Sequence, residues 1–156
     1  MTTDTKLAPL YLDDLAAGQV YEPRGESEPI TAEAIKAYAV QFDPQPFHLD
    51  ETAAADTLFG GLAASGWHTA SLTMRLLLQH GLPLAGGIVG AGIEELRWPR
   101  PLRPGDRLRV RSEVLEVRPS RSRPQQGLAK IRTTTLNQND EPVQVFTGNL
   151  VVPRRP

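Results

Sequence analysis

The chain has 156 residues, enough for one domain with a hydrophobic core and too few for two ordinary domains. It is 40% hydrophobic and 22% charged, as globular proteins are, and it contains no cysteine, which excludes disulfides, thiolate nucleophiles and thiolate zinc sites. Its formal net charge of −1 disfavours nucleic-acid binding. No stretch approaches the roughly 18 apolar residues of a membrane span, and the start of the chain lacks the apolar core of a secretory signal. We therefore expect a cytoplasmic protein.

The first part of the chain predicts an arm, an extended run and one amphipathic helix. Residues 1–18 form the arm, and residues 19–28 form the extended run. Thr31 is a good N-cap, and apolar residues follow it at helical spacing over residues 32–42. We expect this helix to stop directly before Pro44, because proline disfavours a helical conformation in the residue that precedes it.

A loop and a long helix come next. Two prolines are expected to keep residues 43–48 from becoming helical, and a short helical piece follows at residues 51–55. Ser65 is well suited to cap a longer helix over residues 66–80. Apolar residues lie on more than one side of that helix, so we expect it to be largely buried.

Four strands are predicted after this helix, because apolar residues recur there with a period of two. They span residues 87–98, 107–118, 127–136 and 142–152. A change in the apolar phase after Val114 indicates a β-bulge. The order of these elements predicts an α+β fold, in which an antiparallel sheet wraps around the long helix within a single domain over residues 1–156.

Asp43 and His48 lie five residues apart in the proline-containing loop and are a candidate pair for acid–base chemistry. Histidine side chains titrate near pH 6.5 and can therefore act as general bases at neutral pH. Asp43 could either orient the imidazole or hold a water molecule jointly with it. The prolines restrict the loop backbone, which keeps the two groups in register. A purely structural interpretation is that Asp43 caps the loop and His48 is a polar turn residue.

The start of the long helix adds a candidate oxyanion site. Unpaired amide groups at a helix N-terminus carry about half a positive charge. Gly66 has no side chain, so a substrate carbonyl oxygen can approach its N–H closely, as an oxyanion hole requires. A base, a removable proton and an oxyanion donor together predict enolate chemistry on a carbonyl compound.

Three stretches of sequence resemble one enzyme family, the MaoC-like, R-specific enoyl-CoA hydratases. They are DPQPFHLD at residues 43–50, FGGLAASGWHTASL at residues 59–72 and LRWPRPLRPGD at residues 96–106. The resemblance covers nearly the whole chain. It implies a hot-dog fold, in which the sheet wraps around the long central helix. It also implies a homodimer or higher homo-oligomer.

The family motif D-x-N-P-x-H is matched by Asp43, Pro46 and His48, whereas Gln45 replaces the usual asparagine. The glycine that opens the central helix corresponds to Gly66. By this resemblance, the aspartate and histidine would activate water for addition to a trans-2-enoyl thioester, and the glycine N–H would bind the thioester oxygen. The implied substrate is an acyl-CoA, and no metal or cofactor is implied beyond the coenzyme A of that substrate.

Five further residues are candidates for contact with the substrate, because they adjoin the motif or the helix start: Gln45, Pro46, Ser65, Trp67 and His68. Ser65 also fits a capping role, and His68 also fits a packing role. By ungapped counting from Gly66, Met74 takes the place of a serine that helps the acidic residue in some hydratases, and Ser71 or Thr73 could replace it.

Charged residues suggest two other sites. Six arginines near the strand ends could meet the phosphates of coenzyme A: Arg97, Arg100, Arg103, Arg118, Arg121 and Arg123. Asp43, His48 and Asp50 could ligate a metal, but we expect no metal site, because the sequence nominates no convincing further ligand.

Two alternative functions remain open at this point. A hot-dog thioesterase would use an acidic residue to activate water against the thioester carbonyl. A non-catalytic acyl-CoA-binding protein would keep the fold without turnover, and the departures at Gln45 and Met74 are compatible with that alternative.

Overall fold

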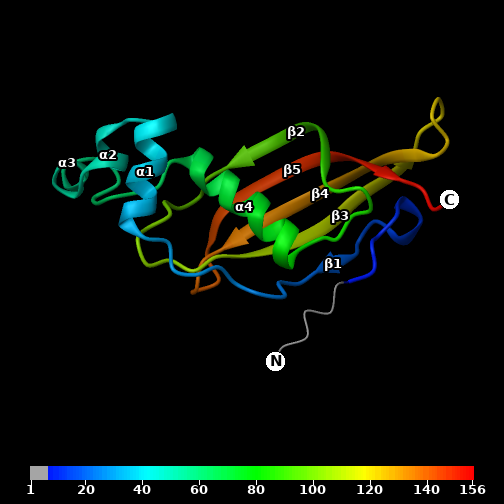
Figure 1. Ribbon diagram of the computed structural model, residues 1–156, viewed down its shortest axis with the longest axis horizontal. Helices are drawn as coiled ribbons and strands as arrows, with labels where there is room; N and C mark the ends of the chain where they lie inside the picture. The colour runs from blue at the N-terminus through cyan, green and yellow to red at the C-terminus, as the bar shows by residue number, and fades with distance from the viewer. Residues whose placement is uncertain (1–6) are drawn as a thin grey trace.

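The computed structural model describes residues 7–156 (Figure 1). Its elements are η1 (Leu12–Asp14), β1 (Val20–Tyr21), α1 (Ala32–Phe42), α2 (Pro46–Leu49), α3 (Glu51–Ala55), α4 (Gly66–His80), β2 (Val89–Arg97), β3 (Arg109–Pro119), β4 (Gln126–Leu136) and β5 (Pro142–Pro153). The strands form one antiparallel sheet in the order β1-β3-β4-β5-β2. Helix α4 crosses one face of this sheet, and α1, α2 and α3 gather near the end where α4 begins (Figure 1). The predicted hot-dog arrangement is confirmed.

The core lies between α4 and the sheet. Leu72, Leu76 and Leu77 of α4 pack in one cluster with residues of the sheet and loops, namely Leu108, Val110 and Val143 together with Ile30, Ile35, Leu62, Ala64 and Leu102. The prediction that α4 is largely buried is wrong for one side of the helix. Trp67, Met74 and Leu78 stay exposed there, at a spacing that places them on one stripe.

The arm joins a second cluster at the far end of the sheet. Leu12 and Leu15 are buried there against residues of α4's C-terminal loop and the strands, namely Leu82, Leu84, Val114, Ala129, Ile131 and Val152. Residues 1–6 of the predicted arm lie outside the described residues. The extended run after the arm contains only a two-residue strand, β1, which pairs with β3 through Val20 and Tyr21.

The loop between the prolines departs from the prediction. Residues 46–49 form the short helix α2, because Pro46 takes the first helical position, where the missing N–H needs no partner and the fixed φ suits the helix. Pro44 still ends α1 as predicted, and Asp43 takes a non-helical φ of −152°.

The other elements agree with the predictions. The side chains of Thr31 and Ser65 cap α1 and α4 by accepting from Ala34 N and Trp67 N. The four later strands lie within two residues of their predicted bounds. The predicted bulge is a register shift in β3 between Val114 and Glu116. In the described part of the chain, no helix is both long and apolar enough to cross a membrane.

Candidate active site

Asp43 and His48 meet at the end of the molecule where the short helices gather. Asp43 ends α1, where its N–H donates to Ala39 O at 2.9 Å, and His48 lies in α2. The Asp43 Oδ2 and His48 Nε2 atoms are 3.3 Å apart. The histidine is only 4% exposed. The short α2 helix therefore brings together two side chains that are five residues apart in the sequence.

A backbone carbonyl fixes the orientation of the His48 ring. Its Nδ1 lies 2.6 Å from Ala63 O. Because a carbonyl oxygen can only accept, Nδ1 must carry the hydrogen, which directs Nε2 toward Asp43. The carbonyl is itself held in place, since Ala63 N donates to Phe47 O at 3.1 Å.

Three neighbours keep Asp43 ionised. Burial alone would raise the pKa of its carboxyl group, but hydrogen bonds from Gln45 and Ser65 and the nearby His48 outweigh that effect and lower the pKa below its ordinary value. Gln45 donates its Nε2 hydrogen to Asp43 Oδ1 at 2.5 Å. The glutamine that replaces the family's asparagine is thus a direct partner of the carboxylate.

Trp98 covers the glycine at the start of α4. A Cβ at Gly66 would lie 2.5 Å from Trp98 Cε2, so only glycine permits this packing. The indole is tethered by its Nε1, which donates to Gln144 Oε1 at 2.9 Å, and the ring of Trp67 packs edge-on against it. As the first N–H of α4, the Gly66 amide has no partner within the helix and is available to an acceptor.

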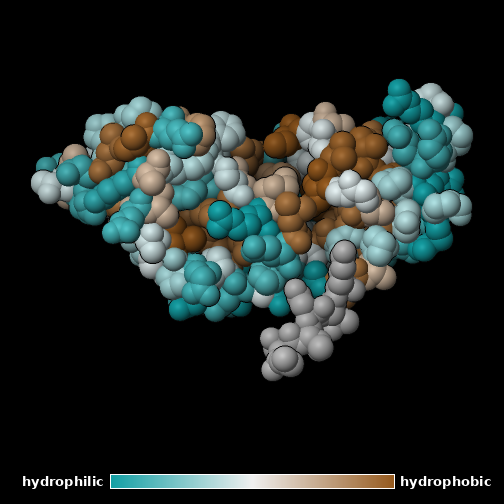
Figure 2. All heavy atoms as spheres, viewed as in Figure 1, coloured by the Kyte–Doolittle hydropathy of each residue, from teal (hydrophilic) through white to brown (hydrophobic). Residues whose placement is uncertain are grey.

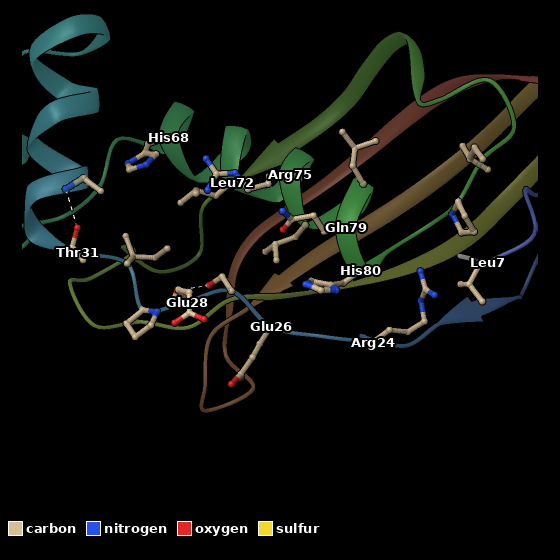
Figure 3. Close-up of a pocket in the computed structure, with 18 of the residues that line it drawn as sticks. Leu7, Arg24, Glu26, Glu28, Thr31, His68, Leu72, Arg75, Gln79 and His80 are labelled. Carbon is tan, nitrogen blue, oxygen red and sulfur yellow. Dashed lines mark hydrogen bonds between the residues drawn. The ribbon is translucent and has the colours of Figure 1, made fainter. Parts of the chain in front are cut away.

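His68 lines a large groove that is separate from the dyad. Its ring stacks on Tyr38 with 4.6 Å between centroids, and its Nδ1 is buried without a partner among residues 7–156. The groove has a volume of about 1360 Å³ and runs between one side of α4 and residues 24–34, with His68, Leu72 and Arg75 on its helical wall (Figure 3). Neither Asp43 nor His48 lines it.

The hydroxyl groups near Met74 do not support the dyad. Thr73 Oγ1 bonds with Thr135 Oγ1 at 2.7 Å in the core, and Ser71 Oγ donates to Trp67 O at 2.9 Å. The hydroxyl group that lowers the pKa of Asp43 is instead that of Ser65. Met74 lines a separate, apolar cavity of about 260 Å³ between α4 and the strands β2 and β5.

Three of the six arginines proposed to meet phosphates have partners within the chain. Arg97 and Arg100 pair with acidic neighbours, and the guanidinium of Arg103 donates to backbone carbonyls within residues 59–62. The hypothesis that Arg103 meets a phosphate is therefore wrong. The Asp50 carboxylate caps α3 by accepting from Ala53 N at 2.7 Å.

Sequence reasoning missed the groups that support the dyad. The Ala63 carbonyl is a backbone atom, so no side-chain pattern could reveal it. The capping role of Ser65 was predicted, but its effect on the pKa of Asp43 was not, because this effect depends on how α1 and α4 pack.

The family of the chain follows from its comparison with known proteins. A profile of the MaoC like domain matches residues 16–136. The chain belongs to the MaoC-like dehydratase family. Two relatives of this MaoC-like protein are an uncharacterized protein, YdeM, of Bacillus subtilis and a 3-hydroxybutyryl-CoA dehydratase of Methylorubrum extorquens. YdeM is 32% identical over 92% of this chain and 97% of its own length. The dehydratase is 34% identical over 76% of this chain and 72% of its own length.

Solved structures agree with this assignment. A MaoC-like dehydratase from Rhodospirillum rubrum is 56% identical, with a TM-score of 0.90 over 94% of this chain and 99% of that one. The R-hydratase PhaJ1 from Pseudomonas aeruginosa is 27% identical, with a TM-score of 0.67 over 94% of this chain and 88% of that one.

Proposed function

We propose that this MaoC-like protein is a hydro-lyase that reversibly adds water to a trans-2-enoyl thioester and yields an R-3-hydroxyacyl thioester. The observation that carries the proposal is the pairing of Asp43 Oδ2 with His48 Nε2 at 3.3 Å, with the ring hydrogen fixed on Nδ1. In the neutral ring both facing atoms are acceptors. One water molecule that donates a hydrogen to each would satisfy both and keep its oxygen lone pairs free for attack.

The reaction then needs only groups that these residues supply. The water oxygen bonds to C3 of the enoyl group, and the π electrons move through C2 to the thioester oxygen. Gly66 N–H stabilises the charge that develops there, an interaction typically worth about 3 kcal/mol in the barrier. One proton of the water passes through the Asp43–His48 pair to C2, and the other stays on the new hydroxyl, so that no oxidation or reduction occurs.

An acyl-CoA is the proposed substrate. The 3-hydroxybutyryl-CoA dehydratase named above supports a coenzyme A thioester, and the R-hydratase supports the R configuration. The apolar cavity beside Met74 offers room for hydrocarbon. It lies eight residues along α4 from Gly66, or about 12 Å at the rise of an α-helix.

We also propose that the protein acts as a homodimer. Strand β2 pairs only with β5 among the described strands, which leaves its other edge open, and Val89 and Ile93 on it are exposed. Figure 2 shows hydrophobic residues, in brown, over the region of β2 and the C-terminal part of α4. Trp67 and Trp98, beside Gly66, are 58% and 41% exposed. A second copy on this face would bury the open edge and enclose the oxyanion side of the site.

The dyad is tested by replacing each member. We expect Asp43→Asn and His48→Gln to lower kcat for hydration of crotonyl-CoA by about 10²- to 10⁴-fold, because each replaces one of the two basic groups that hold and deprotonate the water with an amide that is not basic. The decrease in absorbance of the conjugated thioester measures the reaction. Asp50→Asn is the matched control, because it changes a nearby aspartate in the same way but leaves the α3 cap in place.

Wild-type-like turnover in both folded dyad variants would exclude this mechanism. The alternatives give different signals in the same assay. A thioesterase would release free thiol while the hydroxyacyl product stays absent. A non-catalytic binding protein would bind the thioester without turnover over a range of chain lengths.

A further inference from the structure

Arg103 holds a loop of the backbone that carries no helix or strand. It lies in the turn between β2 and β3, where its own N–H donates to Asp106 Oδ2 at 2.8 Å. Its Nη1 donates to Gly61 O at 2.9 Å and to Leu62 O at 3.3 Å, and its Nη2 donates to Phe59 O. One side chain thus binds three carbonyl groups within four residues.

The loop needs such a partner because its carbonyl groups lack the regular backbone hydrogen bonds of a helix or a sheet. Residues 56–65 form no helix or strand, and buried backbone groups without partners are costly. The planar guanidinium offers five donors in a fixed fork, which a lysine cannot reproduce. Within residues 7–156 no carboxylate lies within ion-pair distance of this guanidinium. A Cβ at Gly61 would lie 3.3 Å from Arg103 Nη1, so a glycine at this position leaves room for the guanidinium group.

The clamped loop leads directly to the carbonyl that orients His48. Leu62 O, held by Arg103, precedes Ala63 O, which accepts the Nδ1 hydrogen of the histidine at 2.6 Å. On the other side, Ala64 N donates to Leu102 O at 2.9 Å. Two consecutive residues of the β2–β3 turn therefore fix the backbone on both sides of the Ala63 carbonyl.

We propose that Arg103 is a positioning residue for His48. By holding the Phe59–Leu62 carbonyls, it keeps Ala63 O where it binds the Nδ1 hydrogen and thereby keeps Nε2 directed at Asp43. The kinetic consequence rests on the proposed hydratase function. The effect on the histidine does not, so the two can fail separately.

Nuclear magnetic resonance of the imidazole nitrogens tests the effect on the ring directly. The chain has three histidines, so long-range proton–nitrogen correlations can be assigned by single substitutions. In the neutral ring of the wild type we expect a protonated Nδ1 and an unprotonated Nε2 for His48. In Arg103→Gln we expect nitrogen shifts averaged between the two tautomers, and in Arg103→Lys an intermediate result.

Kinetics provide the second measurement. We expect Arg103→Gln to lower kcat for crotonyl-CoA hydration by about 10- to 100-fold with little change in KM, because the side chain orients a reacting group without touching the substrate. Arg103→Lys should restore part of this loss. Arg107→Gln is the matched control, since it removes an exposed arginine of the same turn whose side chain pairs with Glu26 at 3.8 Å.

The outcomes separate the two claims. Wild-type His48 nitrogen shifts in folded Arg103→Gln would overturn the proposal, and so would a kcat equal to that of the Arg107→Gln control. If Arg103→Gln does not fold, Arg103→Lys decides, and unchanged nitrogen shifts in it overturn the proposal. If the wild-type protein shows no hydratase activity, the proposed function fails and the nitrogen shifts still test the role of Arg103.

Discussion

At the scale of single residues, His68 shows how burial sets the charge of a side chain. Its Nδ1 is buried without a partner in the described chain, and a bare lone pair there costs less than an unpaired N–H, which places the ring hydrogen on Nε2. Burial, and secondarily the positive charge of Arg75, lower the pKa of this histidine below its usual value. The ring is therefore neutral at neutral pH, in stacking contact with Tyr38.

This pKa shift predicts a pH dependence of stability. The unfolded chain takes up a proton near pH 6.5, whereas the folded protein does so only at a lower pH. The stabilising contribution is complete above about pH 6.5 and is lost as the pH falls toward the folded-state pKa. We expect His68→Phe to reduce the loss of unfolding free energy between pH 7.5 and pH 5.5, as measured by urea denaturation. Identical losses in the variant and the wild type would contradict this explanation.

Some residues of the site could be predicted from the sequence and others could not. Asp43, His48 and Gly66 could be nominated as candidates because they stand in a recognisable motif with fixed spacing. Arg103 was assigned to phosphate because its charge was visible and its partners were not. Its true partners are backbone carbonyls, which look the same at every position of a sequence.

At the scale of elements, the start of α4 depends on the contact between Gly66 and Trp98. The sequence predicted the helix, its serine cap and its open first N–H. It did not predict that an indole from the end of β2 fills the space where a side chain would be. Similarly, the short helix α2 was missed because proline was treated as a helix breaker, although it is favourable at a first helical position.

Gly66→Ala tests the packing at this helix start. The new methyl group would lie 2.5 Å from Trp98 Cε2, so the indole must move and its bond to Gln144 must weaken. We expect the variant to lose about 1–3 kcal/mol of unfolding free energy, the usual cost of overpacking. Thermal or denaturant unfolding measures this loss.

A second substitution identifies the cause. Trp98→Leu makes room for the methyl group, so we expect Gly66→Ala to cost less in a Trp98→Leu background than in the wild type, and a double-mutant cycle gives the difference. Equal costs in the two backgrounds would show that the indole is not the obstacle.

At the scale of the whole molecule, the open edge of the sheet predicts the assembly. Ile93 is exposed on β2, and a lysine there would place a charge in an interface made by two equivalent edges. We expect the wild type to be a dimer and Ile93→Lys to be a monomer by size-exclusion chromatography with light scattering. Val40→Lys, at an exposed hydrophobic residue of α1, should leave the dimer intact. A wild-type protein that is monomeric at micromolar concentration would contradict the proposed dimer.

The sequence predicted the strands but not their neighbours. Alternating apolar residues locate a strand because successive side chains point to opposite faces of the sheet. The pairing of one strand with another depends on residues that are far apart in the chain. The placement of β2 beside β5 therefore came only from the structure.

The strand order also determines when the site can exist. Asp43, His48 and Gly66 all belong to the first half of the chain, yet Arg103 and Gln144, which hold their surroundings in place, belong to the second. Among the described strands, β2 pairs only with β5, which spans residues 142–153. During synthesis Asp43 and His48 emerge close to Gln45 and Ala63, which contact them, but well before Arg103 and Gln144. The surroundings of the candidate site are therefore complete only once the second half of the chain has folded, and the long loops that these contacts close are of the kind that makes folding slow.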